Sequence, residues 1–127
     1  MKRAVILIVV MSLLGTGVGL WMEKSLQKTC DWYLEQEAAL RQLVESDALA
    51  DALQEQRYVY ARWQGESQRL NALVSHHHTR SVDEALLALS TALEHGWQKD
   101  SLRSLDLLYD SLVDLVMDMS LRWENVL

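Results

Sequence analysis

The sequence contains no proline and no phenylalanine, and its 127 residues include one cysteine and five glycines. Without proline, no segment carries the residue that most strongly breaks a helix, and the abundant Leu, Ala, Glu, Gln and Arg all favour helices. One cysteine excludes a disulfide within the chain. An apolar core must therefore stabilise the fold, and the composition predicts an all-α protein.

Basic residues are also few beyond the N-terminus. Residues 23–127 contain all 18 acidic residues of the chain but only ten of its 12 basic residues, which gives this part a formal net charge of −8. A nucleic-acid interface needs clustered Lys and Arg, whereas these residues are scattered singly. We therefore expect no nucleic-acid partner.

A run without charged residues spans residues 4–22 and directly follows Lys2 and Arg3. As a helix, its 19 residues are about 28 Å long, close to the ~30 Å hydrocarbon thickness of a bilayer. Trp21 stands where an aromatic residue would anchor the helix at the membrane surface. We expect residues 1–22 to form a membrane anchor that contacts lipid through residues 4–22, and residues 23–127 to form a helical domain.

A cleaved secretory signal is the alternative interpretation of this segment. Residues 4–14 have the character of a signal-peptide core, and residues 17–19 offer small side chains at cleavage-like spacing. The apolar run continues beyond them to residue 22, which favours a retained anchor.

The charges that flank the anchor predict its orientation. The N-terminal amine, Lys2 and Arg3 precede the run, whereas Lys24 and Lys28 follow it. The positive-inside rule then predicts a single-pass protein of the cell membrane with a cytoplasmic N-terminus and an extracytoplasmic C-terminal domain.

Apolar periodicity divides the remainder into four helical segments. The first continues from the anchor to about residue 45, and the others span about residues 47–76, 81–96 and 100–123. Ser81 and Glu84 match a capping box at the start of the third segment, and Gly96 is suited to end it. Short connections predict an antiparallel up-and-down bundle, although the weak joint near Ser46 also allows the first two segments to form one helix.

Each segment has one apolar face at steps of three and four residues. We expect the following residues to form the core: Leu26, Cys30, Tyr33, Leu40 and Val44 in the first segment; Leu49, Ala52, Val59, Trp63, Leu70 and Leu73 in the second; Val82, Leu86, Leu89 and Leu93 in the third; and Leu102, Leu105, Tyr109, Leu112, Val116, Met119 and Trp123 in the fourth.

Three consecutive histidines, His76, His77 and His78, suggest a metal site. Consecutive side chains on a helix point about 100° apart, and the spacings of three or four that suit chelation are missing. We therefore expect no metal ligands and no cofactor, with His77 packed at the end of the second segment. A metal-binding or metal-dependent protein, in which the three histidines converge in a loop with His95, is the alternative.

Four aspartates recur every four residues in the last segment, opposite its apolar face: Asp106, Asp110, Asp114 and Asp118. Like charges at this spacing destabilise a helix slightly, and calcium needs oxygens that converge from a curved loop rather than a straight row. The stripe is therefore either a solvated face or a surface that binds a cationic partner, and these four residues are the predicted partner-binding site.

Two features allow a homodimer. Gly15 and Gly19 form a pair of small residues through which two membrane helices can approach closely. Cys30 lies on the apolar side of its helix, where a buried thiol is the ordinary outcome, but an odd cysteine outside the cytoplasm can also join two chains.

The arrangement resembles a bacterial membrane-anchored family called domain of unknown function 4363 over nearly the full length. The landmarks are the Lys-Arg start, the tryptophan that ends the membrane helix, Trp63, the His77-His78 step, residues 86–89 and the terminal Asn125-Val126-Leu127. His77 departs from the family, which usually has an acidic residue there. The resemblance implies a membrane-anchored helical domain in which His78 and Asn125 are landmarks, and it implies no known activity.

Together these observations predict a membrane-anchored helical module that is structural or binds another membrane or envelope protein. No pattern indicates catalytic residues, so we do not expect an enzyme.

Overall fold

The computed structural model describes the backbone of residues 2–72 and 74–126, and the side chains of these residues apart from 22, 23 and 119–126. This part of the chain forms four helices and contains no strand. The helices are α1 (Lys2–Glu45), α2 (Leu49–Asn71), α3 (His76–Glu94) and α4 (Gln98–Val126). The all-α prediction is therefore confirmed.

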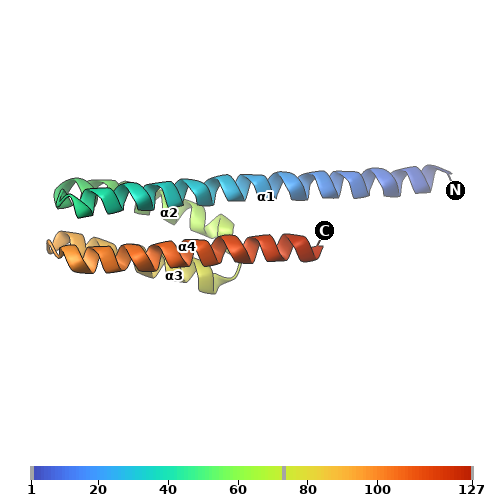
Figure 1. The fold of residues 1–127 in the computed structure, drawn as a ribbon. Helices are drawn as coiled ribbons and strands as arrows, with labels where there is room; N and C mark the ends of the chain where they lie inside the picture. Colours follow the sequence, from blue (N-terminus) through green and yellow to red (C-terminus); the bar gives the residue numbers. More distant parts are fainter. Residues whose placement is uncertain (1, 73, 127) are drawn as a thin grey trace.

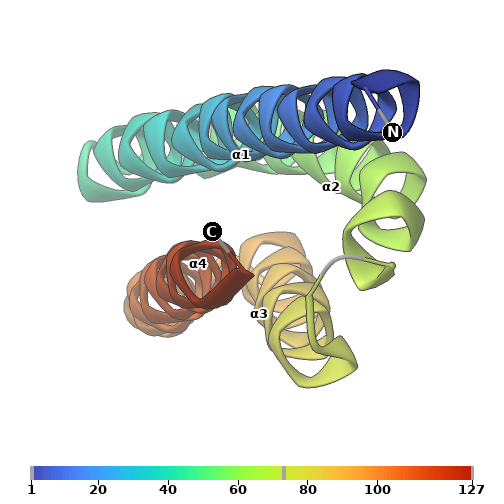
Figure 2. The same ribbon diagram turned by 90° about the vertical axis from the view of Figure 1, so that its right-hand side faces the viewer.

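The helices form an antiparallel bundle. Each one packs against the next in the chain, and α4 packs back against α1. In Figure 1 the chain reverses direction at every connection, and in Figure 2 α1 and α2 lie on one side of the bundle while α3 and α4 lie on the other. This is the up-and-down arrangement that short connections favour.

The N-terminal part of α1 extends beyond the other three helices (Figure 1). Its large apolar side chains are exposed, from 46% for Val10 to 69% for Trp21. The mean hydropathy of its most apolar window is 2.3, so this helix is long and apolar enough to cross a membrane. The same properties also fit a signal sequence.

The core is built from the predicted faces of the first three helices. All five residues predicted for α1 are buried, from Leu26 to Val44, and so are the four predicted for α3. In α2, Ala52, Val59, Trp63 and Leu70 are buried and Leu49 is half-buried, whereas residue 73 lies outside the described residues. The helical period therefore identified these faces correctly.

The predicted face of α4 needs a correction, because Tyr109 is 49% exposed. The buried side chains of α4 are Ser101, Ser104, Leu105, Leu108, Leu112 and Leu115, and Leu102 and Val116 are only half-buried. Since α4 packs against both α3 and α1, its buried face is wider than a heptad seam and is turned away from Tyr109. The predicted Met119 and Trp123 lie outside the described side chains.

The junction of α2 and α3 also differs from the prediction. α2 ends at Asn71 rather than residue 76, and α3 begins at His76, five residues earlier than expected. Ser75 is the N-cap, since its hydroxyl accepts from the His77 N–H at 3.3 Å. Ser81 instead donates to the His77 carbonyl oxygen inside the helix at 3.0 Å. The capping box predicted for Ser81 and Glu84 is therefore wrong.

The two remaining connections lie close to their expected positions. α1 ends at Glu45, and Asp47 has a φ of 60°, which no continuous helix would contain. The first two segments are thus separate helices. Gly96 has a φ of 71° and follows His95, the C-cap of α3, which is the position where a glycine commonly ends a helix.

Candidate functional site

The structure divides the predicted aspartate stripe. Asp106 binds Arg41 of α1 at 2.8 Å, between Oδ1 and Nη2, and Asp118 lies 3.8 Å from the ring of His78 on α3. Asp110 and Asp114 are exposed to solvent. The two outer aspartates therefore contact side chains of other helices, although Asp106 itself stays 67% exposed, whereas the two middle ones form no ion pair with another helix among the described residues.

Apolar side chains flank the two open aspartates. Leu107 and Met117 are 54% and 57% exposed, and helical spacing places them in one row with Asp110 and Asp114. We refer to Leu107, Asp110, Asp114 and Met117 as the α4 outer face. Leu107 and Met117 fall outside the predicted core seam and were therefore not predicted to be part of this surface, although each lies three residues from one of these two aspartates in the sequence.

The histidines do not converge in the described structure. His76 and His77 are exposed, and His78 faces Asp118. His95 lies at the other end of α3, about 28 Å away by helix rise, where its Nδ1 lies 2.8 Å from the Thr91 carbonyl oxygen and its ring stacks on Trp97. The proposed convergence with His95 is therefore wrong. Among the described residues no group of three His, Cys, Asp or Glu side chains could hold a metal ion.

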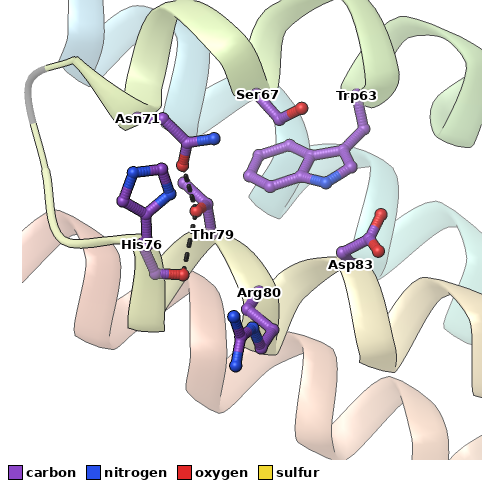
Figure 3. A pocket seen from close by; sticks show the side chains of 7 residues that line it. All are labelled: Trp63, Ser67, Asn71, His76, Thr79, Arg80 and Asp83. Atoms are coloured by element: carbon purple, nitrogen blue, oxygen red, sulfur yellow. Dashed lines mark hydrogen bonds between the residues drawn. The ribbon is translucent and has the colours of Figure 1, made fainter.

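A polar pocket of about 290 Å³ opens between α2 and α3 (Figure 3). Seven residues line it: Trp63, Ser67, Asn71, His76, Thr79, Arg80 and Asp83. Antiparallel packing brings the last turns of α2 beside the first turns of α3, so residues from both helices share this site.

One end of the pocket is ordered by a small hydrogen-bond network. The buried Thr79 hydroxyl donates to Asn71 Oδ1 and lies 3.1 Å from the His76 carbonyl oxygen. Because this contact occupies the amide oxygen of Asn71, it leaves the amide NH₂ available as a donor.

The other end is formed by Trp63, whose side chain is fully buried. Its ring packs edge-on against Tyr33 at 5.4 Å, and the Tyr33 hydroxyl donates to Glu66 at 3.1 Å. The Trp63 Nε1–H has no acceptor among the described residues. Buried indole N–H groups usually find a partner, so this donor distinguishes the pocket from an ordinary surface groove.

Cys30 lies in the core next to this region and is 1% exposed. Burial, together with the charges of Asp31 and Glu66, raises the pKa of its thiol to about 12. The position fits a buried free thiol, and an interchain disulfide would require the bundle to open. Gly15 lies on the exposed part of α1 with no atoms near its missing side chain, so the membrane dimer contact through Gly15 and Gly19 stays a prediction.

We compared the chain with protein-family models, with curated proteins and with solved structures, and none of them matches. The resemblance to domain of unknown function 4363 therefore rests on the sequence landmarks alone.

Proposed function

We propose that this chain is a single-pass membrane protein whose helical bundle binds another membrane or envelope protein and has no catalytic activity of its own. The main support is the continuity of α1. Its 44 residues include both the exposed apolar part and the turns that carry core residues from Leu26 to Val44. A helix without a break would hold the bundle close to the membrane and restrict its tilt, which suits a module that presents one face to a partner in the same membrane.

The α4 outer face is the surface that we assign to the partner. It combines the carboxylates of Asp110 and Asp114 with exposed Leu107 and Met117. The formal net charge of −8 on residues 23–127 also favours a basic partner. A basic amphipathic segment of a membrane or envelope protein would complement this face, since its apolar side chains would cover Leu107 and Met117.

The orientation of the protein in the membrane and its possible dimerisation are proposed from the sequence. Lys2 and Arg3 before the apolar run favour a cytoplasmic N-terminus and an extracytoplasmic bundle. Gly15 and Gly19 are the residues through which a second copy could pack in the membrane. The mass of the mature protein tests anchoring directly, because the intact chain is 14.6 kDa and cleavage after residues 17–19 would remove the apolar part.

The partner is tested by expressing the full-length protein with a C-terminal tag in its native host, crosslinking the membranes and identifying the co-purifying proteins by mass spectrometry. The Asp110→Asn/Asp114→Asn variant should lose the specific partner. The control is Asp31→Asn/Glu84→Gln, which removes two exposed acids from other helices and should retain the partner. Equal recovery by both variants would refute the assignment to the α4 outer face.

A further inference from the structure

The α2–α3 pocket contains a donor and an acceptor that face each other without a bond between them. The Trp63 Nε1–H is buried and has no acceptor among the described residues. In Figure 3 the ring nitrogen lies on the edge of the indole that faces the Asp83 carboxylate. Asp83 is half-buried and forms no ion pair or hydrogen bond within the described part of the chain. An unpaired buried donor is costly, so a ligand atom that bonds to both groups would be stabilised between them.

This pair of groups selects the chemistry of that ligand atom, which must accept from the Trp63 N–H and donate to the Asp83 carboxylate. An ammonium group only donates, and an ionised carboxylate only accepts. A hydroxyl does both through the same oxygen. The Trp63 end of the pocket therefore suits a ligand hydroxyl.

The other polar groups of the pocket call for more than one hydroxyl. The Arg80 guanidinium, which forms no ion pair among the described residues, balances the charge of Asp83 and so favours a neutral ligand. Asn71 offers the NH₂ that its contact with Thr79 leaves unused, and in Figure 3 this nitrogen points along the pocket toward Ser67. A sugar ring is neutral and carries hydroxyls around its whole edge, so it can reach groups at opposite ends.

The dimensions of the pocket suit a single ring. Its lining residues on α2 run from Trp63 to Asn71, a distance of about 12 Å by helix rise. The volume of about 290 Å³ is at the small end of ligand pockets. One ring with its hydroxyls would span this space, whereas a longer glycan would have to continue into solvent.

The position of the pocket favours a ligand from the aqueous phase. Tyr33 of α1 donates to Glu66 of the antiparallel α2. Trp63 is therefore about level with Gln36, about 21 Å beyond the end of the apolar run by helix rise. The headgroup layer occupies only the ~5–8 Å beyond the hydrocarbon on each side of a bilayer. If α1 is anchored as proposed above, the Trp63 end lies outside the bilayer.

We propose that the α2–α3 pocket binds one neutral sugar ring, either a free monosaccharide or the terminal residue of a glycan. One hydroxyl accepts from the Trp63 N–H and donates to Asp83, and further hydroxyls accept from Arg80 and Asn71. Because Trp63 is fully buried, this hydroxyl enters from the Asp83 side and displaces the Asp83 side chain slightly. Only the position relative to the bilayer rests on the proposed anchoring; the binding chemistry does not.

Binding is tested with ¹⁵N-labelled full-length protein in micelles of a detergent that has no sugar headgroup. The protein is titrated separately with D-glucose, D-galactose and N-acetyl-D-glucosamine, and the Trp63 indole resonance is assigned by its loss in Trp63→Phe. At least one sugar should shift this resonance saturably. Glycerol, which has hydroxyls but no ring, should not. No saturable shift with any of the three sugars, or an equal shift with glycerol, would overturn the proposal.

Two variants test whether the sugar lies where we place it. Asp83→Ala removes the acceptor and should weaken binding about tenfold or more. The matched control is Glu84→Ala, because Glu84 is the next residue, is exposed and lies outside the pocket, and its affinity should not change. Trp63→Phe keeps an aromatic ring but removes the N–H, and it should weaken binding similarly when the backbone amide of Ser67 is followed. Parental affinity in Asp83→Ala would overturn the assigned site.

The source of the sugar is distinguished with the methyl glycoside of the sugar that binds, since its blocked anomeric oxygen resembles the linkage of a terminal glycan residue. Retained affinity supports a glycan end, and lost affinity supports a free monosaccharide. The titration requires neither a bilayer nor a protein partner, so its failure would leave the proposed function untouched, and failure to find a partner would leave the sugar site untouched.

Discussion

Arg41 of α1 and Asp106 of α4 are joined at 2.8 Å across the bundle, and the same guanidinium binds the buried Glu37 one turn away, also at 2.8 Å. Arg41 therefore neutralises a carboxylate that the core could not otherwise hold. It also links α1 to α4 through Asp106, whose side chain stays 67% exposed.

Neutralising Asp106 and Asp110 should give different results. The Asp106 side chain is 67% exposed, so Asp106→Asn should lower the free energy of unfolding by no more than about 1 kcal/mol. Asp110→Asn should leave stability unchanged or raise it by about 0.2–0.5 kcal/mol, because it relieves repulsion from Asp106 and Asp114. Urea unfolding measures both. A larger loss for Asp110→Asn than for Asp106→Asn would contradict the division of the stripe.

A charge in the core of α4 should unfold the bundle. Leu112 is fully buried, so Leu112→Asp should cost several kcal/mol against a typical stability of about 5–15 kcal/mol. Asp110→Ala, on the exposed side of the same helix, is the control and should remain folded. Circular dichroism with thermal unfolding distinguishes them, and equal melting temperatures would show that the core assignment is wrong.

The start of α3 can be tested with two serines. Ser75→Ala removes the N-cap acceptor and should cost about 1 kcal/mol. Ser81→Ala, inside the helix, removes only a hydroxyl bonded to its own helix and should change the free energy of unfolding by less than half as much. Denaturant unfolding measures the loss of stability in the two variants. A larger loss for Ser81→Ala than for Ser75→Ala would show that Ser81 is the N-cap, as in the predicted capping box.

Alkaline pH should weaken the fold through Cys30. The unfolded chain loses the thiol proton near the ordinary pKa of 9.0, whereas burial keeps the pKa of the folded thiol at about 12. The folded state then binds more protons between these values, so the free energy of unfolding falls as pH rises above about 9, by up to ~1.4 kcal/mol per pH unit for one thiol. The raised pKa of buried Tyr33 acts in the same direction.

Cys30→Ala separates the two contributions. Compared between pH 8 and pH 10.5, its free energy of unfolding should fall less than that of the parent, because the buried thiol no longer contributes. Equal losses in the two proteins would show that Cys30 is ionised as easily in the folded state as in the unfolded chain.

The bundle was predictable because each helix carries one apolar face with the period of a helix. Val82, Leu86, Leu89 and Leu93 illustrate this: their spacing alone predicted that they are buried. The α2–α3 junction could not be predicted in this way, because residues 74–81 include neither glycine nor proline and contain two serines that can cap a helix. The choice of Ser75 follows from burial of the preceding Val74 in the core, which only the tertiary structure shows.

The pocket was not predictable either. The sequence indicated that Trp63 is buried but not whether its N–H finds an acceptor, since that depends on how α2 and α3 are aligned. Arg80 and Asp83 belong to a different helix and carry no motif that would link them to Trp63. The split of the aspartate stripe has the same origin, because Arg41 and His78 come from helices that only packing brings to α4.

Site-specific photocrosslinking in native membranes tests the central claim most directly. A photoreactive residue replaces Met117 on the α4 outer face or, as the control, Leu87, an exposed apolar residue of α3. We predict one defined adduct with a membrane or envelope protein from position 117 that disappears in the Asp110→Asn/Asp114→Asn background, and no such adduct from position 87. No adduct from position 117, or the same adduct from both positions, would contradict it.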